Sequence, residues 1–173
     1  MLPIRHLSLF ILAFIAGCAK PADLPDIIVS AASPADFARF RADLGARFAP
    51  EQLKDFDTAT QELQLDAMNR DIPTAEGREA DMLRVAHGKT VHAVVRLGWQ
   101  ARKARFLREI AELDRMLKHD LELQAQTAAA GTPPTVTQRI GSEREVLAQL
   151  HRKLAETETR LATLQSDTKE QRS

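Results

Sequence analysis

The sequence predicts an all-α fold, an elongated helical bundle that ends in an antiparallel, coiled-coil-like helical hairpin. Apolar residues recur at three- and four-residue steps through most of the chain, which is the spacing of amphipathic helices. No segment shows the strict apolar–polar alternation of a half-buried strand. There is no proline between Pro73 and Pro133, so this stretch has room for long helices.

The first two helices are predicted between residues 34 and 69. Ser33 is a typical helix cap, and Pro34 fits the first helical position. The apolar face of this helix consists of Phe37, Phe40, Leu44 and Phe48. Ala49-Pro50-Glu51 indicates a break and a second start. The second helix carries Leu53, Phe56, Thr60, Leu63 and Ala67 at helical steps and ends within residues 69–73.

Thr74 is the predicted cap of a third helix, and Gly88 is the expected interruption. This gives a short helix over 75–87 and a long helix from Thr90 to about residue 126, roughly 55 Å at 1.5 Å per residue. The alternatives are one helix running through Gly88, or a two-stranded hairpin around residues 87–89. In the long helix we expect Gly98 to let another helix come close. The apolar stripe consists of Val91, Val94, Val95, Trp99, Phe106, Ile110, Leu113, Leu117 and Leu121.

Residues 127–134 are rich in alanine, threonine and proline and predict the turn of the hairpin. Ser142 and Glu145 fit a capping box, so the last helix is expected to begin there, just after Gly141. Its heptad positions are Leu147, Leu150, Leu154, Thr157, Leu161 and Leu164. These heptads are few, so self-association is an alternative to pairing within the chain. Residues 166–173 lack apolar partners and are expected to form a disordered tail.

One helical domain over residues 34–165 is therefore predicted, and residues 18–33, rich in proline and alanine, are expected to form a flexible tether. Within the tether, Ile27 to Val29 form an apolar cluster that could dock onto the body. Apolar content of 44% and charged content of 28% are ordinary for a soluble domain. The formal net charge of zero gives no bulk attraction to nucleic acid.

The first residues of the chain have the order of a secretory signal. Arg5 and His6 precede an apolar run over residues 7–15, and Ala16-Gly17 lead to Cys18, the single cysteine of the chain. This stretch resembles the lipobox of bacterial lipoproteins. The resemblance implies a signal peptide over residues 1–17, cleavage between Gly17 and Cys18, and a lipid on Cys18. An ordinary secretory signal with a chance cysteine is the alternative.

The same resemblance implies a location. A lipoprotein of this kind is anchored by its acyl chains on the periplasmic side of the cell envelope, and two or more chains hold a protein stably. Ala19 follows the cysteine in place of an aspartate, which indicates the outer membrane rather than the inner one.

Residues 84–108 carry seven basic residues and no acidic one. Much of this charge lies in the first half of the long helix, where the helix dipole disfavours cations. One interpretation is that the cluster pairs with the acidic second and third helices. The other is contact with an anionic partner, such as lipid headgroups, a cell-wall polymer or an acidic protein. The candidate contact residues are Arg96, Arg102, Lys103, Arg105 and Arg108.

No catalytic residue, metal ligand or cofactor is predicted. Gly88-Lys89-Thr90 resembles the end of a phosphate-binding loop, but Leu83 stands where that loop needs its first glycine. The histidines do not have the spacing of a zinc-binding helix. The acidic residues of the second helix have the pattern of a solvated face.

The function expected from the sequence is that of a lipid-anchored, non-catalytic envelope protein, a helical scaffold, adaptor or accessory subunit that contacts another envelope protein. One alternative is a small periplasmic enzyme or metal-binding protein. The other is a binder of anionic cell-wall polymer or lipid through residues 84–108.

Overall fold

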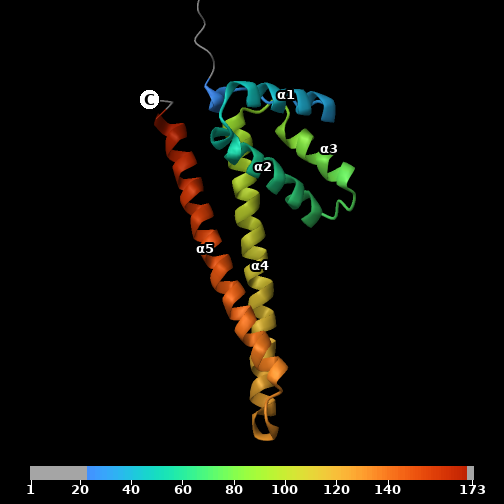
Figure 1. Cartoon of the computed structure of the whole chain (residues 1–173), viewed down its shortest axis with the longest axis vertical. Coiled ribbons are helices and arrows are strands. Elements are labelled where there is room, and N and C mark those ends of the chain that lie inside the picture. The colour runs from blue at the N-terminus through green and yellow to red at the C-terminus, as the bar shows by residue number, and fades with distance from the viewer. Residues whose placement is uncertain (1–22, 171–173) are drawn as a thin grey trace, which may run out of the picture.

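The computed structural model describes residues 23–170 and is all-α in this range (Figure 1). Signal residues 1–17 and Cys18 lie outside the described residues. The five helices, in chain order, are α1 (Pro34–Arg47), α2 (Pro50–Asn69), α3 (Ala75–Ala86), α4 (Val91–Thr127) and α5 (Pro134–Glu170). Short 3-10 helices, η1 (Leu24–Asp26) and η2 (Ala128–Ala130), precede α1 and follow α4.

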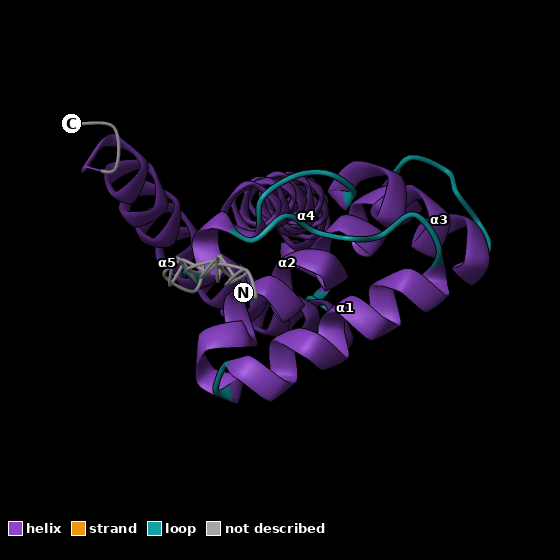
Figure 2. Cartoon of the chain, turned by 90° about the horizontal axis from the view of Figure 1, so that it is seen from above, coloured by secondary structure: helices purple, strands orange, loops and turns teal. Residues whose placement is uncertain are grey.

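The molecule has two parts, a head and an arm (Figure 1). In the head, α2 packs on the first half of α4, which Figure 2 shows nearly end-on, and α1 and α3 pack on α2 and on each other. The arm is the far part of the α4–α5 hairpin, here defined as residues 109–150. The predicted antiparallel hairpin is thereby confirmed, because α5 runs back along α4 over most of its length.

The predicted caps are confirmed at three helices. The side-chain oxygens of Ser33, Thr74 and Thr90 accept hydrogen bonds from backbone N–H groups three residues further on, at 3.1, 3.0 and 3.1 Å. Gly88 interrupts the chain between α3 and α4 with a φ of 73°, in the left-handed region that glycine adopts readily. The single continuous helix through Gly88 and the two-stranded hairpin are therefore both excluded.

Residues 23–33 are held against the head, which corrects the prediction of a flexible tether for this part of residues 18–33. Val29 N–H donates to the Lys89 carbonyl at 2.8 Å, and Gly88 N–H donates back to the Val29 carbonyl at 3.0 Å. Ala31 N–H donates to His87 Nδ1 at 3.1 Å. Val29 and Ala31 are buried in the main core and Ile27 packs against it, whereas Ile28 is exposed, so the predicted docking is confirmed for Ile27 and Val29 of the cluster.

The last helix differs from its prediction at both ends. It begins at Pro134, so Gly141 and the Ser142–Glu145 sequence lie inside α5. Val136 and Ile140 account for this earlier start, because both are buried and extend the apolar seam of the hairpin toward the turn. Helix α5 also continues to Glu170, which corrects the expected disordered tail over residues 166–170.

The main core lies between α2, α3 and α4. Phe56 of α2 is fully buried, and the rings of Phe37 and Phe40 from α1 pack on it with centroids 6.2 and 6.1 Å away. A second, smaller core holds the hairpin together. It consists of Phe106, Ile110, Leu147 and Leu150, with Leu113, Leu117 and Leu154 at its edge. None of the helices in residues 23–170 is both long and apolar enough to cross a bilayer.

Helices α2 and α4 come very close to each other at Gly98, as predicted. A methyl group added at Gly98 of α4 would lie 2.3 Å from the Cα and 2.4 Å from the Cβ of Ala59 in α2. These distances are far below van der Waals contact, so α2 and α4 can touch only because residue 98 has no side chain.

We expect Gly98→Ala and Gly141→Ala to change stability in opposite directions. The first forces α2 away from α4, and overpacking of this kind costs about 1–3 kcal/mol. The second adds a methyl group where nothing lies within 4 Å, inside a helix in which alanine is favoured over glycine by about 1 kcal/mol. Urea unfolding of the two variants tests this. A Gly98→Ala chain as stable as the unsubstituted chain would contradict the close packing.

Candidate functional site

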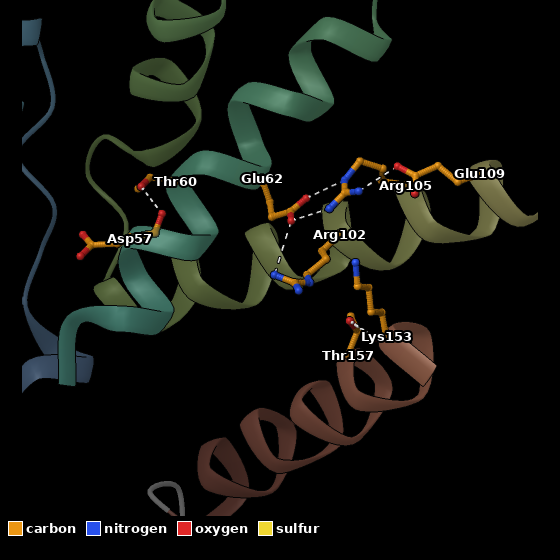
Figure 3. Close-up of polar contacts among 8 residues, drawn as sticks. All are labelled: Asp57, Thr60, Glu62, Arg102, Arg105, Glu109, Lys153 and Thr157. Atoms are coloured by element: carbon orange, nitrogen blue, oxygen red, sulfur yellow. Dashed lines mark hydrogen bonds and ion pairs between the residues drawn. The ribbon is translucent and has the colours of Figure 1, made fainter. Parts of the chain in front are cut away.

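The basic segment of α4 is the surface that the sequence nominates as functional, and in the structure it lies between α2 and α5 (Figure 3). Its main contact is Glu62, a buried residue of α2 with 5% of its surface exposed. Arg105 binds both oxygens of this carboxylate, with Nε 3.0 Å from Oε2 and Nη2 2.7 Å from Oε1. Arg102 Nη1 lies 3.5 Å from Oε1. We call Glu62, Arg102 and Arg105 the Glu62 clasp.

Arg105 binds a second acidic residue besides Glu62. Its Nη1 donates to Glu109 on the next turn of α4 at 2.8 Å. The hydrogen bonds to Glu62 are the main cause that raises the pKa of Arg105 above its ordinary value, against the effect of burial. The guanidinium therefore stays charged, and two-point binding of a carboxylate by arginine fixes its orientation.

Aromatic rings cover the same arginines. The Arg102 guanidinium carbon lies 5.0 Å from the centroid of the Trp99 ring and 5.3 Å from that of Phe106. The Arg105 guanidinium carbon lies 4.6 Å from the Phe106 centroid. These are cation–π distances. Trp99 of the predicted apolar stripe is partly buried and packs against the main core.

The remaining candidate residues divide between the two neighbouring helices. Lys103 Nζ lies 2.7 Å from Glu158 of α5, and Arg108 Nη2 lies 3.7 Å from Asp66 of α2. Among the described residues no ion pair joins Arg96, whose Nε is buried without a hydrogen-bond partner. Four of the five predicted residues thus pair with acidic residues of this chain. The three arginines among them face α2, in agreement with the interpretation that the basic cluster pairs internally, and Lys103 faces α5. Contact with an external anion stays a prediction.

Two further ion pairs, which the sequence did not predict, link α5 to α2 and to α4. Arg160, near the end of α5, binds Asp55 of α2 with Nε 2.9 Å from Oδ2, which ties the end of the hairpin to the head. Near the turn, Arg139 binds both oxygens of the buried Asp120 at 2.6 Å. The Arg139 hydrogen bonds are the main cause that lowers the pKa of Asp120 below its ordinary value.

The buried acids could in part have been found from the sequence. Glu143 falls at a seam position of α5 between Ile140 and Leu147, and Asp120 follows Leu117 by three residues on α4. A charge at such a position is a recognisable signal. Glu62 gives a weaker signal, because it lies at the border of the apolar face of α2. Its partner could not be chosen without knowing how α2 crosses α4.

The Glu62 clasp joins α2 to α4 and holds the guanidinium groups of Arg102 and Arg105 against aromatic rings. Within residues 23–170 no three histidine, cysteine or acidic side chains are grouped so that they could hold a metal ion. The lipidation residues Gly17 and Cys18 lie outside the described range. No family model, curated protein or solved structure matches this chain.

The burial of Glu62 predicts that Glu62→Gln is more costly than an equivalent change at an exposed pair. The variant leaves two partly buried guanidinium groups without a carboxylate, which we expect to lower the free energy of unfolding by about 2 kcal/mol. Asp57 is the matched control, because Arg41 binds both of its oxygens at 2.6 Å but the pair is more exposed. Asp57→Asn should cost less than about 1 kcal/mol. Equal losses in urea unfolding would show that burial does not decide the strength of the clasp.

Proposed function

We propose that this chain is a lipid-anchored, non-catalytic envelope protein that acts as a helical scaffold or adaptor, with the arm as its partner-binding surface. The observation that carries the proposal is the shape of the molecule. The α4–α5 hairpin extends well beyond the helices that cover its base (Figure 1).

The distribution of exposed apolar residues supports the same proposal. A soluble domain has some exposed apolar side chains, and their grouping on one element is the informative observation. Four large ones among the described residues lie on α4 and α5, either in the arm or next to it, namely Leu107, Met116, Leu121 and Val146. A two-helix arm with apolar residues on its outside is suited to receive a further helix.

The way the head holds the N-terminal segment fits an anchored protein. Residues 23–33 are fixed on the loop between α3 and α4 through backbone hydrogen bonds. A lipid on Cys18 would therefore lie only a few residues from a rigid attachment point on the head. The head would then stand close to the membrane surface, while the arm carries the binding surface.

An anionic lipid or cell-wall polymer is the second candidate partner, and Arg96 favours it. Of the five basic candidates it is the one with no ion pair among the described residues. The internal pairs of the other four favour the protein-binding role, because an external anion would have to compete with buried or nearby carboxylates of the same chain.

The lipid anchor predicts that the chain incorporates labelled palmitate in cells of its native host and that Cys18→Ala abolishes the label. Ser166→Ala, which changes an exposed hydroxyl near the other end of the chain, is the control and should label normally. Label that survives in the Cys18→Ala chain would overturn the anchor.

The adaptor role predicts site-dependent crosslinking in the same cells. A photoreactive amino acid placed at Met116 or Val146 of the arm should yield one discrete adduct with another envelope protein. The same amino acid at Met68, an exposed residue of the head, should not yield that adduct. Crosslinks from all positions alike, or from Met68 alone, would contradict a binding surface on the arm.

A further inference from the structure

One side of the arm is hollowed where α4 and α5 meet. Two adjoining cavities share Glu112 and Met116, so they form a continuous groove, which we call the arm groove. Its α4 wall extends from Glu109 to Asp120, about 17 Å at 1.5 Å per residue. The α5 wall consists of Arg139, Glu143, Val146 and Leu150.

The most unusual residue of the arm groove is Glu143. It occupies a seam position of α5, between Ile140 and Leu147, and only 8% of its surface is exposed. Its Oε2 is buried and accepts no hydrogen bond in the described part of the molecule. A buried carboxylate oxygen that lacks a donor is costly, so this position is understandable if the Glu143 carboxylate turns into the groove that it lines and accepts a donor there.

The nearest cation does not meet this need. Arg139 attracts Glu143 electrostatically, but two of its guanidinium nitrogens donate to the two oxygens of Asp120 at 2.6 Å. Asp120 is also buried, with 4% of its surface exposed, so it requires this pair itself. One arginine thus faces two buried acids and hydrogen-bonds only one of them.

The rest of the groove is apolar with an acidic rim. Leu113 and Leu150 line it, and Met116 and Val146 are half-exposed at its edges. Four acidic residues line the groove, Glu109, Glu112, Asp120 and Glu143, against the two bases Arg115 and Arg139. A partner that fits must therefore offer apolar side chains and a positive charge together.

We infer that the arm groove binds an amphipathic helix of another protein that inserts a lysine or arginine toward Glu143 and Glu112 and packs apolar residues on Met116 and Val146. This inference rests on the proposed adaptor function and specifies the chemistry of the partner. The bound helix is the third member of a coiled coil whose other two are α4 and α5. The long stem of the basic residue lies along the apolar lining, and its charged end supplies the donor that Glu143 lacks.

A set of synthetic peptides tests the inference on the purified full chain. The peptides share one amphipathic design, constrained to be helical, with leucines at i, i+3 and i+7, and differ only at a central position that holds lysine, glutamine or glutamate. Fluorescence anisotropy should give the tightest binding for lysine and binding at least about tenfold weaker for glutamate.

Variants of the chain locate the effect. Glu143→Gln, alone and with Glu112→Gln, should remove most of the preference for lysine while circular dichroism shows an unchanged helical fold. Glu145→Gln removes the same charge two residues away at an exposed position outside the groove, and should keep the full preference. Met116→Glu should weaken binding of all three peptides.

Four results would overturn the inference. The peptides bind equally, or none binds, or Glu145→Gln lowers the lysine preference as much as Glu143→Gln does. If a second copy of the chain fills the groove instead, sedimentation shows a dimer that Met116→Glu dissociates, which also overturns it.

The outcome for the adaptor role is separate. A crosslinked adduct from Val146 that persists in the Glu143→Gln chain, together with equal binding of the peptides, refutes the cationic partner and retains the arm as a binding surface. If the chain without the Glu143 substitution gives no adduct from either Met116 or Val146, the adaptor role itself is refuted.

Discussion

The contact between Gly98 and Ala59 is the constraint on which the head depends. Because no side chain separates the backbones there, α2 and α4 cross at close range, and the side chains on either side of the crossing are brought into register. Glu62 then reaches Arg102 and Arg105, and Asp66 approaches Arg108. A larger residue at position 98 would separate these pairs as well as the apolar core, so packing and electrostatics at this interface share one geometric cause.

The charges of the head serve mainly to join helices. The basic residues in the first half of α4 are opposed by the helix dipole, and the carboxylates of α2 and α5 offset that cost. The buried ion pairs of Glu62 have the greatest structural importance, because only 5% of its surface is exposed and water can hardly replace its arginine partners. Exposed pairs such as Arg41 with Asp57 have similar geometry but compete with water, so they contribute less.

The arm differs from the head in how its buried acidic residues are paired. It has only two helices, and its core is a single seam of apolar residues that is interrupted by two acidic positions, Asp120 and Glu143. Replacement of a buried charge by an apolar residue is often neutral or stabilising, so stability alone does not account for the two acids. In the head the buried carboxylate of Glu62 is bound by Arg105, whereas one buried oxygen of Glu143 in the arm has no donor. This difference is why the arm is the place where we expect a partner.

The sequence alone determined the helices, because capping residues such as Thr90, the glycine at position 88 and heptad spacing act over only a few neighbours. It also predicted the hairpin and the close approach at Gly98. It predicted the start of α5 wrongly, because the capping signal at Ser142 is local whereas Val136 and Ile140 gain from packing on α4. The individual partners of the basic segment, the hydrogen bonds that hold residues 23–33 and the arm groove were decided by tertiary structure alone. Each depends on which faces of distant helices meet, and the local pattern of residues carries no record of that choice.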